Sequence, residues 1–465
     1  MFALQRLSRP LAWLAGPAVC IVATSAVVAQ AGAMASWTVA KNPNPGTVDD
    51  SLSSVACPSA ADCWAVGDQD SGTSVSDEQS LVEHWDGARW SVVLSNKVKG
   101  RGNQATALSG VACTSHSNCW AVGDVSPGDG PQQPLFEHWN GSKWAASVLS
   151  TGAGLDYFVD GVTCANAKEC WAVGYTSPQP TAGPPRDTVW VARWDGAAWT
   201  SEPSTQLGAL NGVTCTGPTL CWAVGYGDTV SDGGTSKAVA TLVEAWDGVS
   251  WSRRPSPNDG TGDNALNATS CTSAGHCWAV GYWSKGTGDS AASSSQNLFL
   301  TWDGGSWRIA SGTQGSDDNA PRLNLNSLSG IDCLASTCWA VGGYSSGSGS
   351  AYKTLIAVWG GHSWALASST PNANNNVANA LSSIACADVS HCVAVGSYGL
   401  LGSGASLVLQ CRGQCAAVSD AGHLAGRSAI AISARAGEAT PDSRDDICRH
   451  PSPLSVLPAA LLPAR

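Results

Sequence analysis

The chain has 465 residues, a formal net charge of −11 at pH 7 and only 13% charged residues, with 52 Gly and 22 Trp. So many Trp residues exclude an intrinsically disordered chain, which lacks large apolar side chains. The acidic balance and the lack of a basic run exclude nucleic acid as a partner, because phosphate groups would be repelled.

The N-terminus has the pattern of a secretion signal. Arg6 and Arg9 precede an apolar run from Leu11 to Val28, and small-residue cleavage sites such as Ala33-Met34-Ala35 follow it. The alternative is an uncleaved membrane anchor, which the small residues within the run disfavour. We therefore predict a signal peptide over residues 1–35 and a secreted, extracellular protein without membrane contact after cleavage.

A six-residue motif, CWAVGY at Cys170–Tyr175, occurs seven times in the chain with small changes. Its second position falls at Trp64, Trp120, Trp171, Trp222, Trp278, Trp339 and Val393. Successive copies are 51 to 61 residues apart, and a period near fifty is typical of repeat architectures.

One complete unit contains four short strand candidates and no stretch of helical periodicity. Strand a is Leu210–Cys215, strand b is Cys221–Tyr226, strand c is Thr241–Trp246 and strand d begins at Trp251. Asp-Gly, a strong hairpin signal, separates c from d and recurs at Asp86-Gly87, Asp195-Gly196, Asp247-Gly248 and Asp303-Gly304.

Seven such units predict an all-β fold, a seven-bladed β-propeller of four-stranded antiparallel blades. The seventh unit lacks strand d, and CRGQC (Cys411–Cys415) stands where the Trp hairpin belongs. The missing strand matches the N-terminal segment SWTVAKNPNPG at Ser36–Gly46. We therefore expect this strand to close the ring, with the propeller spanning residues 36–415.

The apolar strand ending in Gly, followed by a variable loop and a second strand with a spaced Trp, resembles kelch-type propellers. These include the central domain of galactose oxidase. Kelch repeats normally carry a Gly-Gly pair after the apolar strand, and here only Gly342-Gly343 provides it. With its cysteines and Trp-Asp-Gly, the unit looks more like secreted bacterial propeller repeats.

Each unit carries two cysteines that flank the turn between strands a and b. Such a turn brings its two flanks within disulfide reach. The expected disulfides join Cys57 with Cys63, Cys113 with Cys119, Cys164 with Cys170, Cys215 with Cys221, Cys271 with Cys277, Cys333 with Cys338, and Cys386 with Cys392. Metal binding is the alternative, but only some units offer a nearby His, so we expect no metal site and no cofactor.

Tryptophan pairs flank the c–d turn at Trp85/Trp90, Trp139/Trp144, Trp194/Trp199, Trp246/Trp251, Trp302/Trp307 and Trp359/Trp364. Rings across a hairpin can pack against each other. A ring of aromatic side chains could also form sugar platforms. One Trp position in every blade favours packing between blades.

Composition changes after Cys415, and residues 416–465 show no repeat pattern. A disordered tail and an aberrant end produced by a frame change both fit this segment. The pairing of Cys411, Cys415 and Cys448 stays open at this point.

No catalytic constellation stands out. The Asp-Gly-x-x-Trp pattern is one residue shorter than the Asp box of sialidase-type propellers, and no nucleophile motif or P-loop occurs. Glu83-His84 and Glu137-His138 recur on strand c. Recurrence in equivalent positions favours a surface role for these pairs over catalysis.

Two classes of function fit: a non-enzymatic, monomeric module that binds a glycan or a protein, and a secreted carbohydrate-active hydrolase or lyase with a site at the channel mouth. We favour the binding module. Variable loops on a rigid scaffold usually carry binding residues. On the face with the long b–c and d–a loops the candidates are Tyr175, Tyr226, Tyr282, Trp283, Asp68 and Asp124.

Overall fold

A computed structural model describes residues 36–416 except 71, 73–77, 96–103, 127–129, 152–153, 179–186, 203, 205, 229–237, 285–294, 313–324, 346–350, 368–369 and 401–402. The predicted signal peptide, most of the C-terminal segment and Cys448 lie outside the described residues. Those assignments stay predictions.

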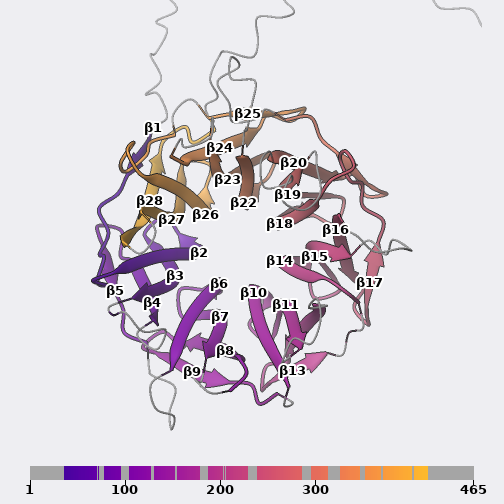
Figure 1. The fold of residues 1–465 in the computed structure, drawn as a ribbon, viewed down its shortest axis with the longest axis horizontal. Helices are drawn as coiled ribbons and strands as arrows, with labels where there is room; N and C mark the ends of the chain where they lie inside the picture. Colours follow the sequence, from indigo (N-terminus) through magenta and orange to yellow (C-terminus); the bar gives the residue numbers. More distant parts are fainter. Residues whose placement is uncertain are drawn as a thin grey trace, which may run out of the picture. The chain divides into compact units, whose positions relative to one another are not determined.

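Seven blades of four antiparallel strands are arranged in a ring, which confirms the predicted fold class (Figure 1). One parallel bridge, Ser295 opposite Leu325, also links the sheets of blades 5 and 6. Blades 1 and 2 are β2 (Asp49–Ser59), β3 (Asp62–Asp70), β4 (Glu78–Trp85), β5 (Trp90–Val92), then β6 (Ala105–Ser115), β7 (Asn118–Ser126), β8 (Gln133–Trp139), β9 (Trp144–Val148). Blades 3 and 4 are β10 (Leu155–Asn166), β11 (Glu169–Pro178), β12 (Thr188–Trp194), β13 (Trp199–Glu202), then β14 (Ala209–Gly217), β15 (Leu220–Asp228), β16 (Val239–Trp246), β17 (Trp251–Arg254).

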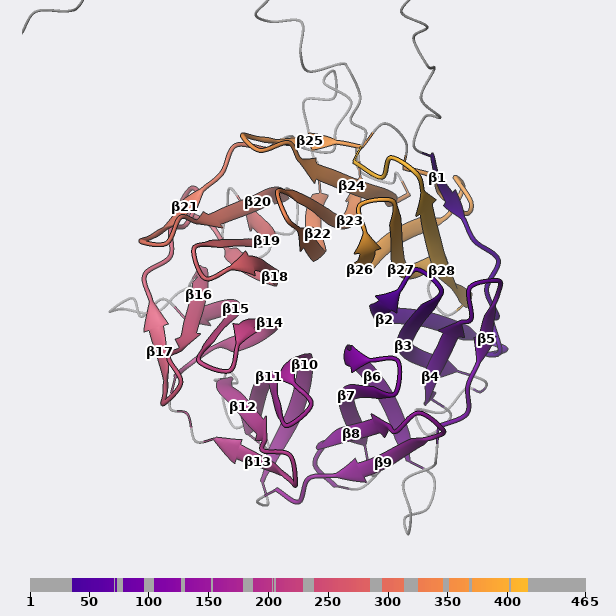
Figure 2. The same ribbon diagram turned by 180° about the vertical axis from the view of Figure 1, so that it is seen from behind.

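Blades 5 and 6 are β18 (Asn264–Ser273), β19 (His276–Ser284), β20 (Ser295–Trp302), β21 (Trp307–Ile309), then β22 (Leu325–Leu334), β23 (Thr337–Ser345), β24 (Lys353–Trp359), β25 (Trp364–Leu366). Blade 7 is β26 (Ala378–Asp388), β27 (His391–Leu400) and β28 (Ser403–Arg412), completed by β1 (Ser36–Val39). The first strand of each blade lies innermost, as Figure 2 also shows from behind.

The N-terminal strand closes the ring as expected. β1 pairs antiparallel with β28 from Ser36 opposite Arg412 to Val39 opposite Leu409. Trp37 lies opposite Cys411, the register that Trp199 and Trp194 share in blade 3, and it is only 4% exposed. Trp37 therefore takes the place of the strand-d tryptophan in the last blade.

The glycine that ends each motif is required by close backbone approach. Strand a carries a β-bulge opposite it, and a Cβ added to Gly67 would lie 2.0 Å from the Ser51 carbonyl oxygen. The same approach, within 2.0 Å of a strand-a carbonyl, occurs at Gly123, Gly174, Gly225, Gly281, Gly342 and Gly396. Any larger residue would push the innermost strand out of its blade.

Disulfide bonds join all seven expected cysteine pairs, each within one blade and across the a–b turn. The bonded pairs are Cys57–Cys63, Cys113–Cys119, Cys164–Cys170, Cys215–Cys221, Cys271–Cys277, Cys333–Cys338 and Cys386–Cys392. Each bond ties the innermost strand of a blade to the strand beside it.

The second cysteine of each pair lies on strand b inside the core. Five of these side chains are 0% exposed, namely Cys119, Cys170, Cys221, Cys277 and Cys338. No ligand can reach a side chain so deeply buried from either end of the ring.

An eighth disulfide bond joins Cys411 to Cys415, whose side chains are each 1% exposed. The Trp339 indole N–H donates to the Cys415 carbonyl oxygen at 2.8 Å. The segment CRGQC is thus part of the packed end of blade 7.

Each motif tryptophan packs against the next blade. The Trp64 ring lies 4.6 Å from Trp139 and 5.2 Å from Trp144, both in blade 2, between ring centroids. Trp139 and Trp144 face each other across their hairpin at 5.9 Å. The arrangement recurs around Trp120, Trp171 and Trp222, so the Trp positions serve packing between blades.

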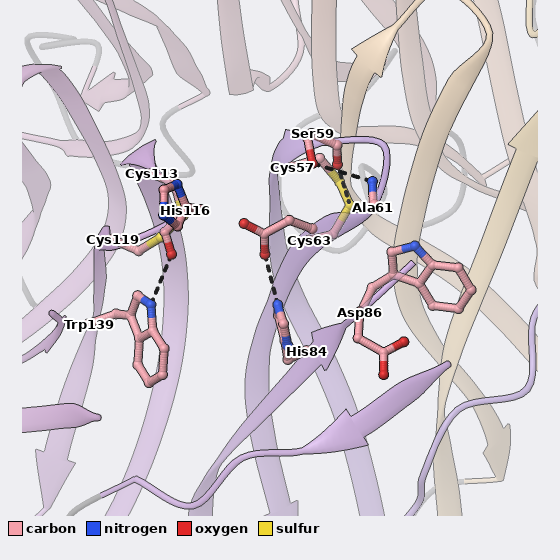
Figure 3. A network of polar contacts seen from close by, with 12 residues as sticks. Cys57, Ser59, Ala61, Cys63, His84, Asp86, Cys113, His116, Cys119 and Trp139 are labelled. Atoms are coloured by element: carbon pink, nitrogen blue, oxygen red, sulfur yellow. Dashed lines mark hydrogen bonds and ion pairs between the residues drawn. A yellow bond between two sulfur atoms is a disulfide. The ribbon is translucent and has the colours of Figure 1, made fainter. Parts of the chain in front are cut away.

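The a–b and c–d turns share one end of the blades, which we name the turn face. The Trp139 indole N–H donates to the His116 carbonyl oxygen of the a–b turn at 3.1 Å (Figure 3). Trp85 makes the same bond to Ala60 at 3.2 Å. The opposite end, where strand b passes to c and strand d to a, is the loop face.

The expected surface position of the Glu-His pairs is wrong for the glutamates. Glu83 and Glu137 are 0% and 2% exposed, because alternate residues of strand c point into the space between blades. Asn42, just after β1, donates to Glu83 Oε1 at 3.3 Å. Burial raises the pKa of Glu83 to about 8. His84 stays partly exposed, bound to Asp62 at 2.7 Å (Figure 3).

Closure by β1 predicts a large effect of Trp37→Ala. Removing a buried Trp from the blade 7 core should lower the free energy of unfolding by about 3–5 kcal/mol. Val39→Ala, a change at a residue 44% exposed on the same strand, should lower it by less than about 1 kcal/mol. Urea unfolding of both variants checks this, and equal small losses would contradict closure by β1.

The buried carboxyl of Glu83 predicts a pH-dependent stability. With a folded-state pKa raised from 4.5 to about 8, the stability it supports is full below pH 4.5 and is lost as pH rises through about 8. Glu83→Gln keeps an acceptor for Asn42 and cannot ionise. It should raise the free energy of unfolding by on the order of 2 kcal/mol near pH 9 and change it little near pH 5. An equal effect at both pH values would refute this account.

Candidate functional site

The predicted ligand-binding residues lie on strands, which corrects their placement in loops. Asp68 and Asp124 belong to β3 and β7, Tyr175 and Tyr226 to β11 and β15, and Tyr282 and Trp283 to β19. Strand b continues past its glycine because strand a extends alongside it and keeps pairing. Tyr175, for example, lies opposite Phe158 of β10. The residues therefore stand on rigid strand ends near the loop face.

Blade 3 departs from the repeat at an innermost position beside Tyr175. Phe158 stacks on Tyr175 with 4.6 Å between ring centroids and 15° between ring planes. In the other six blades the residue in this register is small: Ser51, Ala107, Ala209, Ala265, Ser327 and Ala380. The half-buried aromatic stack thus belongs to one blade of the described ring.

The same strand carries a second departure, at its bulge. Asn211 and Asn267, the bulge residues of blades 4 and 5, donate their side-chain amides to the carbonyl oxygens of Leu266 and Leu328 in the following blade, at 2.9 and 2.7 Å. Blade 3 places Asp160 at this bulge. Its Oδ2 atom is buried and makes no hydrogen bond among the described residues.

Asp124 joins this group from the neighbouring blade. Its Oδ1 atom accepts a hydrogen bond from the backbone N–H of Val159 at 2.9 Å, which holds β7 against β10 one residue before Asp160. We name Asp124, Phe158, Asp160 and Tyr175 the mouth cluster. It lies between blades 2 and 3, near the loop face.

The acidic groups of the mouth cluster hold their protons unusually tightly. Burial raises the pKa of Asp124 to about 8, and the nearby Asp160 and Glu78 add to the shift. Burial also raises the pKa of Asp160 to about 7. The pKa of Tyr175 is raised by burial first, and then by Asp160 and Tyr226. Burial is the largest cause of each shift, and the hydrogen bond from the Val159 backbone N–H acts against the shift of Asp124.

The remaining predicted residues lie apart from the mouth cluster. Asp68 accepts a hydrogen bond from the Ser51 hydroxyl at 2.7 Å, and burial raises its pKa. Burial and Asp263 raise the pKa of Tyr282. Trp283 is partly buried and packs against the core between blades 4 and 5. Of the six predicted residues, Asp124 and Tyr175 lie near Asp160, and Tyr226 lies near Tyr175.

The turn face carries an open groove of about 660 Å³ between blades 2 and 3. His138 and Trp194 line it, together with Asn118 and Asn166. His138 is bound to Asn118 at 2.6 Å and stacks on Trp120 at 4.3 Å. The equivalent imidazole in blade 1 is held in the same way, so this side chain belongs to the repeated framework.

Phe158 and Asp160 were missed by sequence reasoning. The signal was present, because the aligned strand-a segments read LSS, LSG, LNG, LNA, LSG and LSS in six units and VDG in blade 3.

Within the described ranges, no group of three or more His, Cys, Asp or Glu side chains is placed to hold a metal ion. The part of the chain that the structure describes also contains no helix able to span a membrane.

No protein-family model and no curated protein sequence matches this chain, so the likeness to kelch repeats stays a resemblance. Among solved structures, it is similar to YCF48 bound to D1 peptide, with 13% identity and a TM-score of 0.45 over 83% of this chain and 95% of that one. It is also similar to the SapL1 lectin in complex with alpha methyl fucoside, with 13% identity and a TM-score of 0.38 over 67% and 96%.

A third similar structure is a polysaccharide lyase, ulvan lyase, with 8% identity and a TM-score of 0.47 over 76% of this chain and 90% of that one. Each of these scores lies below 0.5, so what those proteins bind carries no argument about this chain.

Proposed function

We propose that this protein is a secreted, non-enzymatic binding module that recognises a glycan or a protein on its loop face, at the mouth cluster. The scaffold suits export, because eight disulfides persist in an oxidising environment. The blades supply a rigid ring, and strand ends hold the side chains that meet the ligand.

The break in the repeat at blade 3 carries this proposal. A binding site is needed once on the ring, whereas framework residues recur in each blade. Tyr175 and Phe158 form an aromatic surface, while Asp124 and Asp160 supply carboxyl oxygens beside it. A phenol hydroxyl and a protonated carboxyl both donate and accept hydrogen bonds, which suits a hydroxyl-rich ligand.

One observation favours the second candidate, a carbohydrate-active hydrolase or lyase at the channel mouth. The pKa values of Asp124 and Asp160, raised by burial to about 8 and about 7, lie where a general acid or base operates. The mouth cluster would then contact the scissile linkage. Release of reducing sugar or of an unsaturated product by the purified protein would favour this candidate over the binding module.

The proposal predicts that Tyr175→Ala removes most of the affinity for any ligand found on a glycan array or in a peptide screen. Loss of the aromatic surface should weaken binding by tenfold or more, about 1.4 kcal/mol. His138→Ala, on the turn face, should leave the affinity within about twofold. Calorimetric titration of both variants measures this.

Loss of binding in the His138 variant with full binding in the Tyr175 variant would place the ligand on the turn face and overturn the proposed site. Unfolding of each variant in urea serves as the control for folding, because Tyr175 is half-buried.

A further inference from the structure

Asp160, at the blade 3 bulge, packs the ring less well than an Asn side chain would at the same position. At the equivalent positions Asn211 and Asn267 each donate to a carbonyl oxygen of the next blade. An Asn amide offers two N–H donors for this bond, whereas an Asp side chain has at most one carboxyl proton. Asp160 also leaves Oδ2 buried without a hydrogen bond in the described structure. A buried, unsatisfied carboxylate oxygen is unfavourable unless a ligand satisfies it.

The charged groups near Asp160 indicate which charge a ligand bound there would carry. The charged groups that raise the pKa of its neighbour Asp124 are Asp160 and Glu78. Those that raise the pKa of Tyr175 are likewise acids or a phenol: Asp160, Tyr226, Asp187 and Asp124. An anionic ligand would be repelled at this place. A cation would supply the counter-charge that the protein leaves out.

The stack of Phe158 on Tyr175 indicates which kind of cation the site would bind. A half-buried Tyr ring beside two carboxyl groups is the combination that binds an ammonium group, through the ring face and charge-assisted hydrogen bonds. The neighbouring hydroxyls of Tyr175 and Tyr226 suit the hydroxyl groups of a sugar that bears the ammonium.

We propose that the mouth cluster binds the protonated amine of an amino sugar, with Asp160 and Asp124 as its counter-ions and the stacked Tyr175 as its aromatic wall. This inference rests on the proposed function, since it names the ligand class of the same site. Because burial raises the pKa of Asp124 to about 8 and that of Asp160 to about 7, an ammonium ligand that binds near pH 6 should displace protons from them.

The test compares a glucosamine oligosaccharide with its N-acetylated counterpart, which lacks the positive charges and carries acetyl groups in their place, at about pH 6, where the free amines carry protons. Calorimetric titration of the full chain should show that the glucosamine oligosaccharide binds at least tenfold more tightly, about the effect of one charge pair. Its binding enthalpy should depend on the buffer's heat of ionisation, because protons are released.

The deciding variant is Asp160→Asn. The new amide can donate to the Leu210 carbonyl oxygen as Asn211 does to that of Leu266, so stability in urea should be unchanged or higher. Binding of the glucosamine oligosaccharide should fall at least tenfold. The reverse change, Asn211→Asp, is the matched control. It should lower stability near pH 8 and leave affinity within about twofold.

Each other outcome overturns a defined part of the argument. Equal binding of both oligosaccharides, lost in Tyr175→Ala, would refute the ammonium inference and keep the proposed site. Binding of a lysine-rich peptide in place of the oligosaccharide would assign a protein ligand and refute the amino sugar. Binding that survives both the Tyr175 and the Asp160 changes would overturn the proposed site itself.

Discussion

The indole of each motif tryptophan is covered by the following blade, and this single contact obliges the chain to form a closed ring. Trp120, for example, meets Trp194 and Trp199 of the next blade at 4.7 and 5.3 Å. A blade on its own would expose that indole side chain to water. Burial of an aromatic side chain stabilises a fold by about 2–3 kcal/mol, so an open end of the array would lose at least this amount. Seven blades leave no such end only if the last one packs on the first.

Closure is where the repeat has to change. In blade 7 the motif has Val393 in place of Trp, and this smaller side chain packs against Trp85 and Trp90 of blade 1. The Trp pair that Trp339 should meet is replaced by Trp37 from the N-terminus and by the Cys411–Cys415 disulfide. A strand from the other end of the chain thus restores the contact that sequence continuity cannot provide.

The mouth cluster differs from the other blades in its side chains and not in its backbone. Motif glycines and strand-a bulges recur in all seven blades, so backbone geometry at each innermost strand is nearly fixed. Against that background only side chains differ from blade to blade. Phe158 and Asp160 occupy two innermost positions where the other blades carry Ser, Ala or Asn. A fixed backbone with local changes of side chain provides one chemically distinct site on a repeated scaffold.

The sequence by itself determined the repeat, the strand order, the disulfide pairs and the closing strand. Period-2 patterns, Asp-Gly turns and cysteine spacing are local, and local geometry decides their pairing. Only the tertiary structure decided which side chains meet between blades. It buried Glu83, moved Tyr175 from a loop to a strand end, and brought Asp124 beside Asp160, 36 residues away. These contacts depend on how one sheet packs on the next, and no pattern within a single unit records that packing.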